Sequence, residues 1–290
     1  MLKFKKISKN YKTIKALKNV SFSIPENSIF GILGANGSGK STFMKILPGL
    51  IYDWSGEIYY HNKLINQKDM LLKKDFGYLI ESPTFYEYLS AKHNLEILAR
   101  ISDVNSHRIN YVLDMVNLTK RSDDKVHTYS YGMKQRLGIA QAMLHDPKVI
   151  ILDEPNNGLD PNGIDDMTRL IKQLKTEGKT VCLSTHNLKD VEEVCTDFTI
   201  FKEGENSATT SMEEQLKNSN KWFISINNPL LAESKIKGSQ LFKIIKMFNQ
   251  NILIESKSEN TVNELNQLLA NLEIYKISKE SNLIEYFKND

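Results

Sequence analysis

The sequence has 290 residues, of which 40% are hydrophobic and 25% charged, and its formal net charge is only +3. This composition is typical of a folded globular protein and argues against a disordered chain, a fibrous chain or a strongly basic nucleic-acid binder. No apolar run approaches the 18 residues that a membrane span needs, and the start of the chain lacks a signal-peptide core, so we expect a chain that does not itself cross a membrane. The only cysteines, Cys182 and Cys195, lack metal-ligand spacing and are expected to be reduced thiols.

Short apolar runs broken by polar pairs predict strands within residues 1–33, and the run at 29–33 (IFGIL) predicts a buried strand. The first twenty residues contain several lysines and no acid, and we expect these lysines to form a solvated strand face. Helical spacing follows residue 39 and ends at Pro48-Gly49. Further apolar runs at 58–60 and 76–80 again predict strands.

The spacing of apolar residues is helical from about residue 90 to 144. Apolar strands are then expected at 149–152 and 180–183, with a helical stretch between them. Strand, helix and strand in this order predict an α/β fold, in which helices pack on the faces of a parallel sheet.

After about residue 219 the pattern changes. Strands are expected at 224–226, 252–254 and 274–277, an amphipathic helix at 262–272 and a last helical turn at 283–287. No nucleotide motif lies in this part, which we interpret as a small α+β appendage with its boundary between 205 and 220.

A glycine-rich loop at residues 34–41 (GANGSGKS) fits the pattern G-x-x-x-x-G-K-[ST] in full, between an apolar strand and a predicted helix. The glycines let backbone N–H groups turn toward phosphate oxygens, and the following helix adds the positive end of its dipole. Lys40 can reach the β- and γ-phosphates and Ser41 can ligate Mg²⁺, so the loop predicts binding of ATP with Mg²⁺. The loop residues expected to contact the nucleotide are Gly34, Asn36, Gly37, Ser38, Gly39, Lys40, Ser41 and Thr42.

Two adjacent carboxylates, Asp153 and Glu154, follow the apolar strand at 149–152. A carboxylate at a strand tip beside a phosphate loop suits Mg²⁺, directly or through water, and a second one can orient or deprotonate an attacking water. Pairs of this kind are common on solvated faces. Because this pair follows a buried strand in a chain with a phosphate loop, it predicts a hydrolytic site.

Three further segments accompany these motifs: residues 130–136 (SYGMKQR), residues 157–160 (NGLD) and His186. In this order, the motifs resemble those of the ATPase subunit of ATP-binding-cassette (ABC) transporters over roughly residues 1–215. The resemblance implies a P-loop NTPase domain with a parallel-sheet core, an antiparallel β subdomain and a helical subdomain at about 85–140. A small α+β domain at 216–290 would follow it.

The resemblance also implies roles for individual residues. In this family, the Ser and Gly of the signature motif contact the γ-phosphate bound to the opposite subunit, and these roles fall on Ser130 and Gly132. Asp160 matches the D-loop aspartate. The implied catalytic residues are Lys40, Glu154 and His186, and the implied metal ligands are Ser41, Glu81 and Asp153. Tyr11 matches the aromatic residue that stacks on adenine, although a lone tyrosine between strands is about as often simple packing.

The chain departs from the family pattern at two places. The usual signature is Leu-Ser-Gly-Gly-Gln, whereas residues 129–133 are YSYGM, which keep the Ser and the second Gly. The glutamine that usually follows the strand at 76–80 is replaced by Glu81, so that an anionic metal ligand replaces a neutral one. This change either alters how the loop holds the metal and contacts the membrane subunit, or it is a tolerated isostere.

Glu81 and the residues after it resemble one subgroup of the family, which contains ATPases of bacitracin and lantibiotic self-protection transporters and of phenol-soluble modulin exporters. The resemblance therefore implies an ATPase at the cytoplasmic face of the cell membrane, as a peripheral subunit. It would work with a hydrophobic transmembrane permease subunit and a second ATPase subunit, either the same chain or a related one, and export amphipathic or antimicrobial peptides.

Two other functions are compatible with a phosphate loop. One is a soluble mechanical ATPase that acts on nucleic acid or ribosomes. Such relatives carry a long coiled-coil insertion or two cassettes, whereas this chain has one cassette and a short segment between Glu81 and Ser130, so we expect no nucleic-acid partner. The other is a regulatory subunit without hydrolysis, which the presence of Lys40, Glu154 and His186 argues against.

Overall fold

The computed structural model describes residues 2–66, 74–257 and 261–281. The chain divides into two compact units, Met1–Thr210 and Ser211–Asp290. Each unit has its own hydrophobic core. Over the described ranges, no helix has both the length and the apolar character that a bilayer span requires.

An antiparallel sheet of four strands opens the first unit, in the order β2-β1-β4-β5. Its strands are β1 (Leu2–Tyr11), β2 (Ile14–Ile24), β4 (Ser55–Tyr60) and β5 (Lys63–Leu64). Buried and exposed side chains tend to alternate along β1 and β2, because successive side chains point to opposite faces of a sheet and one face of this sheet covers the core.

The lysines at the start of the chain lie on this sheet, and most of them are exposed, as predicted. Lys9 is an exception, and the prediction of a solvated side chain was wrong there. It is buried because its ammonium donates hydrogen bonds to the backbone carbonyls of Tyr52 (2.7 Å) and Asp53 (3.2 Å). A buried charge needs such partners.

The second sheet contains the parallel strands that the sequence predicts. Strands β9, β3, β8, β7 and β6 are mutually parallel neighbours in this order, and β10 pairs antiparallel with β9. Their bounds are β3 (Ile29–Leu33), β6 (Phe76–Leu79), β7 (Val149–Asp153), β8 (Thr180–Thr185), β9 (Asp197–Lys202) and β10 (Glu205–Asn206). Every residue of β3, β7 and β8 is buried, as expected for strands that are covered on both faces.

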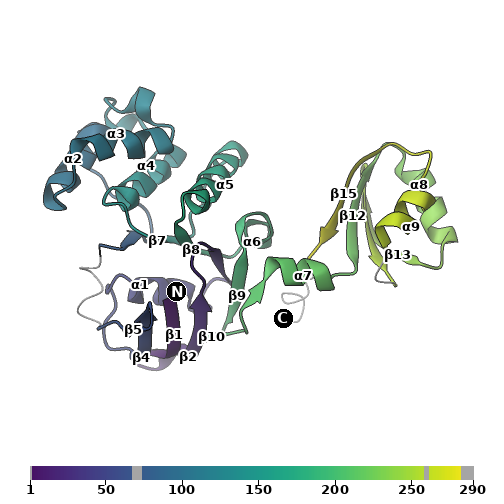
Figure 1. Ribbon diagram of the computed structural model, residues 1–290, viewed down its shortest axis with the longest axis horizontal. Coiled ribbons are helices and arrows are strands. Elements are labelled where there is room, and N and C mark those ends of the chain that lie inside the picture. Colours follow the sequence, from purple (N-terminus) through teal and green to yellow (C-terminus); the bar gives the residue numbers. More distant parts are fainter. Residues whose placement is uncertain (1, 67–73, 258–260, 282–290) are drawn as a thin grey trace. The chain divides into compact units, whose positions relative to one another are not determined.

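Helices flank the parallel sheet and also form a separate group (Figure 1). Those next to the sheet are α1 (Lys40–Ile46), α5 (Pro161–Thr176) and α6 (Leu188–Val194). The separate group contains α2 (Ala91–Ile101), α3 (Ser106–Met115) and α4 (Tyr131–Met143), with 3₁₀ turns at Thr119–Arg121 and Val126–Thr128. Within the first unit, this group and the antiparallel sheet lie on opposite sides of the parallel sheet. The predicted helical subdomain is thus confirmed.

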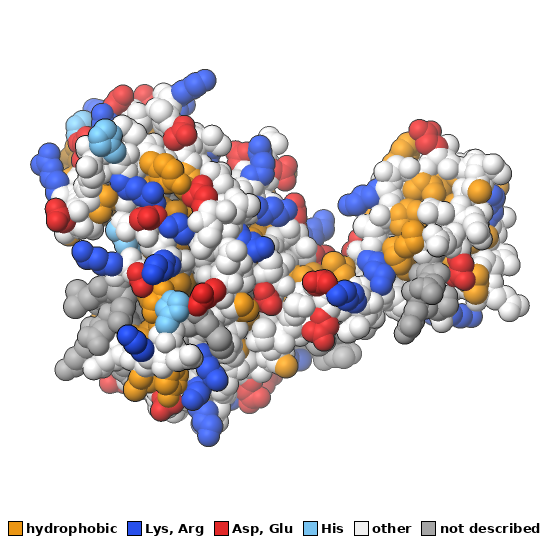
Figure 2. Space-filling model, viewed as in Figure 1, with side chains coloured by type: hydrophobic (Ala, Val, Ile, Leu, Met, Phe, Trp, Pro, Cys, Tyr) orange, Lys and Arg blue, Asp and Glu red, His pale blue; other side chains and the backbone are white. Residues whose placement is uncertain are grey.

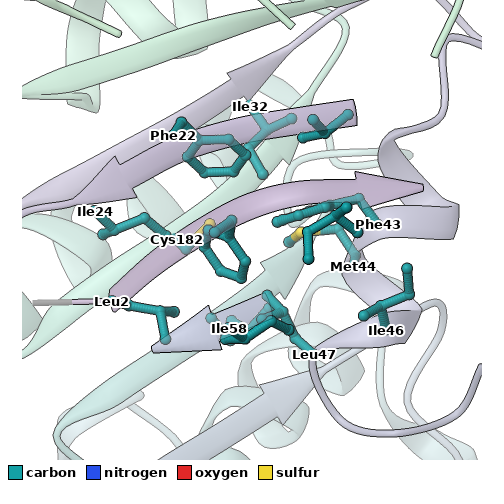
Figure 3. Close-up of a cluster of buried hydrophobic side chains, with 14 of the residues drawn as sticks. Leu2, Phe22, Ile24, Ile32, Phe43, Met44, Ile46, Leu47, Ile58 and Cys182 are labelled. Atoms are coloured by element: carbon teal, nitrogen blue, oxygen red, sulfur yellow. The ribbon is translucent and has the colours of Figure 1, made fainter. Parts of the chain in front are cut away.

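The first core lies between the antiparallel sheet and the parallel sheet, with α1 packed into it (Figure 3). Phe43 of α1 contacts Phe4, Phe22 and Phe201, with ring centroids 4.8 to 5.6 Å apart. Aromatic pairs of this geometry contribute about 0.5–1.5 kcal/mol each beyond the burial of their area. This packing holds α1, and with it the loop that precedes α1, in a fixed position.

The second unit is built around an antiparallel sheet in the order β13-β14-β12-β15. Its elements are α7 (Met212–Asn218), β12 (Lys221–Ile226), α8 (Pro229–Gly238), β13 (Phe242–Phe248), β14 (Asn251–Ser256), α9 (Thr261–Leu268) and β15 (Ile274–Glu280). The short strand β11 (Thr210–Ser211) lies at the boundary between the units. From β12 onward the order of elements is βαββαβ, and apolar side chains of the sheet and of α8 and α9 form the second core.

The predicted α+β character of this unit is confirmed. The three expected strands are present as β12, β14 and β15, and the expected helix is present as α9, although it ends at Leu268. The sequence did not predict α7, α8 or β13. The helical turn expected at 283–287 lies outside the described residues.

Acidic and basic side chains are interspersed on the face of the first unit that Figure 2 shows. This distribution agrees with the small net charge.

Candidate active site

The glycine-rich loop connects the carboxyl end of β3 to the start of α1, as the sequence predicts. Gly37 and Gly39 have positive φ angles of 82° and 108°, which residues with a Cβ rarely adopt. Gly34 is needed for a different reason. A Cβ there would lie 2.4 Å from the carbonyl oxygen of Phe201 and 2.6 Å from Oγ of Ser38. The loop conformation therefore depends on glycine at these three positions.

Lys40, the first residue of α1, points back into this loop. It is 4% exposed, and its Nζ donates hydrogen bonds to the carbonyl oxygens of Gly34 (2.8 Å) and Ala35 (3.1 Å). The hydroxyl of Ser38 is also buried and has no hydrogen-bond partner among the residues that the structure describes. A buried ammonium and a buried hydroxyl without a partner, in one loop, suit an anionic ligand such as a phosphate.

Asp153 ends β7, and its carboxylate meets the neighbouring strand β8. Oγ of Ser184 donates a hydrogen bond to Oδ1 of Asp153 (2.5 Å) and accepts one from the backbone N–H of Glu154 (2.9 Å). Burial raises the pKa of Asp153 above its ordinary value, and the hydrogen bond from Ser184 acts in the opposite direction. One hydroxyl thus fixes both the Asp153 side chain and the start of the turn that follows it.

Glu154 lies at the centre of the site. Its Oε1 is 3.4 Å from Nζ of Lys40, and its Oε2 is 2.6 Å from Nδ1 of His186. Glu154 itself has a positive φ of 48°, a strained conformation for a residue with a Cβ, which is typical of functional positions. His186 directly follows β8 and is about half exposed, so the Glu154 carboxylate lies between a buried cation and an accessible imidazole.

A pocket of about 770 Å³ opens beside the loop, a size that suits a nucleotide. Its lining includes Tyr11, Asn36, Gly37, Gly39, Lys40, Ser41, Thr42 and Glu154 from the predicted site, and also Thr13, Ile14, Lys15, Ala16, Lys18, Glu203 and Gly204. Tyr11 is 43% exposed, and Nζ of Lys9 lies 5.0 Å from the centre of its ring. The tyrosine is therefore accessible to a planar ligand in this pocket.

Glu81, the residue that departs from the family pattern, follows β6 with a positive φ of 61°. Its carboxylate forms an ion pair with Nζ of Lys45 on α1. The hydrogen bond to Glu81 raises the pKa of Lys45, and the charge of Asp153 acts in the same direction. The extra negative charge of Glu81 therefore lies next to Lys45. The charge of Lys45 in turn interacts with that of Asp153.

Eight predicted site residues are not among those that line this pocket: Gly34, Ser38, Glu81, Ser130, Gly132, Asp153, Asp160 and His186. Five of them belong to the loop or to the contacts described above, whereas Ser130, Gly132 and Asp160 do not. Ser130 and Asp160 are exposed and cap helices, since Ser130 accepts a hydrogen bond from the backbone N–H of Met133 (3.3 Å) and Asp160 one from that of Gly163 (2.9 Å). One chain therefore does not bring these residues onto its own phosphate loop.

Besides the unpredicted residues of the pocket lining, sequence reasoning missed Ser184 and Lys45, which contact the acidic side chains of the site. Ser184 is a polar residue directly after the apolar run at 181–183 in β8, a position that is visible in the sequence but does not indicate its partner. Lys45 lies on a helix predicted from the sequence, but its pairing with Glu81 joins residues far apart in the chain.

The oxygen-bearing side chains in this region fit Mg²⁺, a hard cation that prefers oxygen ligands. Among the described residues, no cluster of three or more His, Cys, Asp or Glu side chains could hold a metal by itself. A hydroxyl on α1, Ser41, and a buried carboxylate, Asp153, suit an ion that takes its remaining ligands from phosphates and water.

Comparison with known proteins agrees with this geometry. The family model described as "ABC transporter" matches residues 17–157. The lantibiotic transport ATP-binding protein SrtF of Streptococcus pyogenes is 36% identical over 235 residues, which cover 81% of this chain and 100% of that protein. This chain belongs to the ABC transporter ATP-binding proteins.

One further similar protein and one solved structure agree with this membership. The bacitracin transport ATP-binding protein BcrA of Bacillus licheniformis is 40% identical over 208 residues, which cover 70% of this chain and 67% of that protein. Among solved structures, a dimeric post-hydrolysis structure of the ATP-binding cassette MJ0796 bound to ADP and Pi matches with a TM-score of 0.65 and 28% identity, over 73% of this chain and 99% of that chain. The first unit is thus an ATP-binding cassette, and the chain is an ATPase that binds ATP.

Proposed function

We propose that this chain is the ATP-hydrolysing subunit of an exporter and powers a separate membrane permease. The observation that carries the proposal is the cluster at the phosphate loop, in which the Glu154 carboxylate lies between Lys40 and His186. A carboxylate held in this way is suited to act as a general base toward water. Its neighbour Lys40 is suited to neutralise phosphate charge.

The residues of the chain would divide the chemistry among them. The N–H groups of the glycine-rich loop bind phosphate oxygens, and the ring of Tyr11 stacks on the adenine. Glu154 accepts a proton from the attacking water, while His186 holds the carboxylate through its Nδ1–H. Mg²⁺, when bound through Ser41 and Asp153, supplies positive charge to the β- and γ-phosphates.

A complete site needs a second subunit, because Ser130, Gly132 and Asp160 do not line the pocket of their own chain. We infer that Ser130 and Gly132 of one copy close over the γ-phosphate bound to the other copy. The dimeric structure of the similar cassette MJ0796 supports this arrangement. The second subunit could be the same chain or a related one, and the site chemistry is the same in both cases.

The transported molecule is proposed to be an amphipathic or antimicrobial peptide. Two of the similar proteins are named for lantibiotic and bacitracin transport, which supports this substrate class. A peripheral position at the cytoplasmic face of the cell membrane follows from the proposed permease partner.

The proposal is tested by purifying the tagged chain from native membranes and identifying the proteins that remain with it. We expect one hydrophobic permease subunit, and we expect bacitracin or a lantibiotic to stimulate the ATPase activity of the complex. The matched control is Lys40→Ala, which should keep the permease and lose the stimulation. Recovery of ribosomes or DNA without a permease would refute export and favour a mechanical ATPase.

A further inference from the structure

The tyrosine in the signature motif contacts the loop that follows the catalytic carboxylate of the same chain. Gly158 of this loop has a positive φ of 76°. A Cβ placed on Gly158 would lie 3.2 Å from Cε1 of Tyr131. The Tyr131 ring therefore packs closely over the backbone of Gly158. At the position of Tyr131, the signature of this family usually has glycine.

The ring is held in place from the other side. The Tyr131 hydroxyl accepts a hydrogen bond of 2.9 Å from Nε2 of Gln135, one turn later on α4. Gln135 is only 3% exposed, so its side chain is fixed by packing and holds the tyrosine in one orientation. Because both residues belong to α4, the ring moves with the helix that Ser130 caps.

The loop under the ring leads directly back to the active site. The N–H of Asn157 donates a hydrogen bond to the carbonyl oxygen of Glu154 (3.0 Å), and the N–H of Leu159 donates one to that of Asn156 (3.2 Å). These two turns make residues 154–159 a short, internally bonded segment. A displacement of Gly158 is therefore transmitted to the backbone of Glu154, over only four residues.

We propose that Tyr131 is a positioning residue that couples the two nucleotide sites of the dimer. This inference rests on the proposed function, in which Ser130 meets the γ-phosphate bound to the other copy. Closure of Ser130 over that phosphate would move the start of α4. Tyr131 transmits this movement to Gly158 and hence to Glu154, which acts on the chain's own nucleotide. Hydrolysis at one site then depends on occupancy of the other.

The test compares Tyr131→Gly, which installs the usual family residue, with Tyr131→Phe, which keeps the ring. In wild-type background, the readout is the Hill coefficient for ATP in steady-state hydrolysis. In a Glu154→Gln background, it is the dissociation constant of the ATP-bound dimer, measured by analytical ultracentrifugation. Tyr88→Gly is the matched control, because it also removes an exposed tyrosine but one that lies outside the signature motif.

We expect Tyr131→Gly to bring the Hill coefficient close to 1 and to weaken the ATP-bound dimer about tenfold, within the range of ordinary coupling between sites. Tyr88→Gly should change neither quantity by more than about twofold. Tyr131→Phe keeps the ring but loses the hydrogen bond from Gln135, so both quantities should lie between those of the wild-type protein and those of Tyr131→Gly. An unchanged Hill coefficient and dimer constant in Tyr131→Gly would overturn the role of Tyr131. Failure of Glu154→Gln alone to form an ATP-dependent dimer would instead refute the shared site of the proposed function.

A reciprocal variant guards against a loss caused only by poor folding of Tyr131→Gly. Gly158→Ala places a methyl group against the ring and strains the backbone, so it should lower the Hill coefficient as well. If the contact between Gly158 and Tyr131 carries the coupling, the double variant Gly158→Ala/Tyr131→Gly should be no worse than Tyr131→Gly alone, because the contact is already lost in that single variant. Strictly additive effects of the two changes would contradict the proposed coupling.

Discussion

Replacing Glu154 with glutamine separates nucleotide binding from hydrolysis in this site. The amide has the same shape as the carboxylate but cannot accept the proton of an attacking water. It also removes one charge that lies 3.4 Å from Nζ of Lys40. At this distance and an effective dielectric constant of ~20, the gross Coulomb attraction is about 5 kcal/mol, much of which desolvation of the two groups offsets.

The Lys40 ammonium does not lose all of its partners in this variant. It keeps its hydrogen bonds to Gly34 and Ala35, so the phosphate loop should retain its shape. Removing a negative charge beside the phosphates also removes a repulsion. We therefore expect Glu154→Gln to bind ATP at least as tightly as the wild-type protein, and kcat to fall by ~10²–10⁴-fold, the usual contribution of a general base. This loss corresponds to about 3–5 kcal/mol in activation free energy.

Two measurements on the same preparations test this expectation. Release of inorganic phosphate gives kcat, and titration with a fluorescent ATP analogue gives Kd. The exposed residue Glu57, whose carboxylate accepts a hydrogen bond from Tyr59, provides the control variant Glu57→Gln, which should leave both quantities unchanged. Phosphate release by Glu154→Gln within about threefold of wild type would remove Glu154 from the role of base.

Other perturbations test the surroundings of this carboxylate. Because burial raises the pKa of Asp153, ionisation of this side chain lowers the stability of the fold as the pH rises through that raised pKa. Asp153→Asn should therefore raise the Tm at about pH 7 but not near pH 3, where the acid is protonated in both the folded and the unfolded state. Equal melting points of the variant and the wild-type protein at neutral pH would contradict this. The changes in the free energy of unfolding caused by Lys45→Met and Glu81→Gln should be non-additive by about 0.2–1 kcal/mol in urea, as expected for a solvent-accessible ion pair. Strict additivity would show that the pair does not form in solution. Gly34→Ala should lower the free energy of unfolding by ~1–3 kcal/mol and the Tm by ~2–12 °C in a thermal scan, because the added Cβ would clash with the carbonyl oxygen of Phe201. An unchanged Tm would mean that the loop relaxes at no cost.

Sequence reasoning succeeded where a pattern is local. The apolar run at 29–33 and the helix that follows the glycine-rich loop are both present, because a buried strand and a loop with fixed glycines leave few alternatives. The carboxylates of Asp153 and Glu154 also lie where a strand tip predicts them. In each case the residues that decide the structure are neighbours in the sequence.

Features that depend on distant residues were not predictable. Strand β13 lacks a clean alternation because a bulge interrupts its pairing with β14 between Ile244 and Lys246. Burial of Lys9 depends on two carbonyls more than 40 residues away. The pairing of Lys45 with Glu81 and the contact between Tyr131 and Gly158 likewise arise only once the chain has folded.

The end of β8, where Ser184 lies just before His186, restricts the insertions and deletions that related chains can tolerate. Side chains alternate along a strand, so a one-residue insertion or deletion before Ser184 would turn its hydroxyl away from Asp153 and carry His186 out of reach of Glu154. Active homologues should therefore keep the length of β8 unchanged, even where their surface loops differ by several residues. A library of single-codon insertions, selected for growth in the presence of bacitracin or a lantibiotic as the proposed substrates, should contain no insertions at these codons and should recover insertions in the loop between α8 and β13.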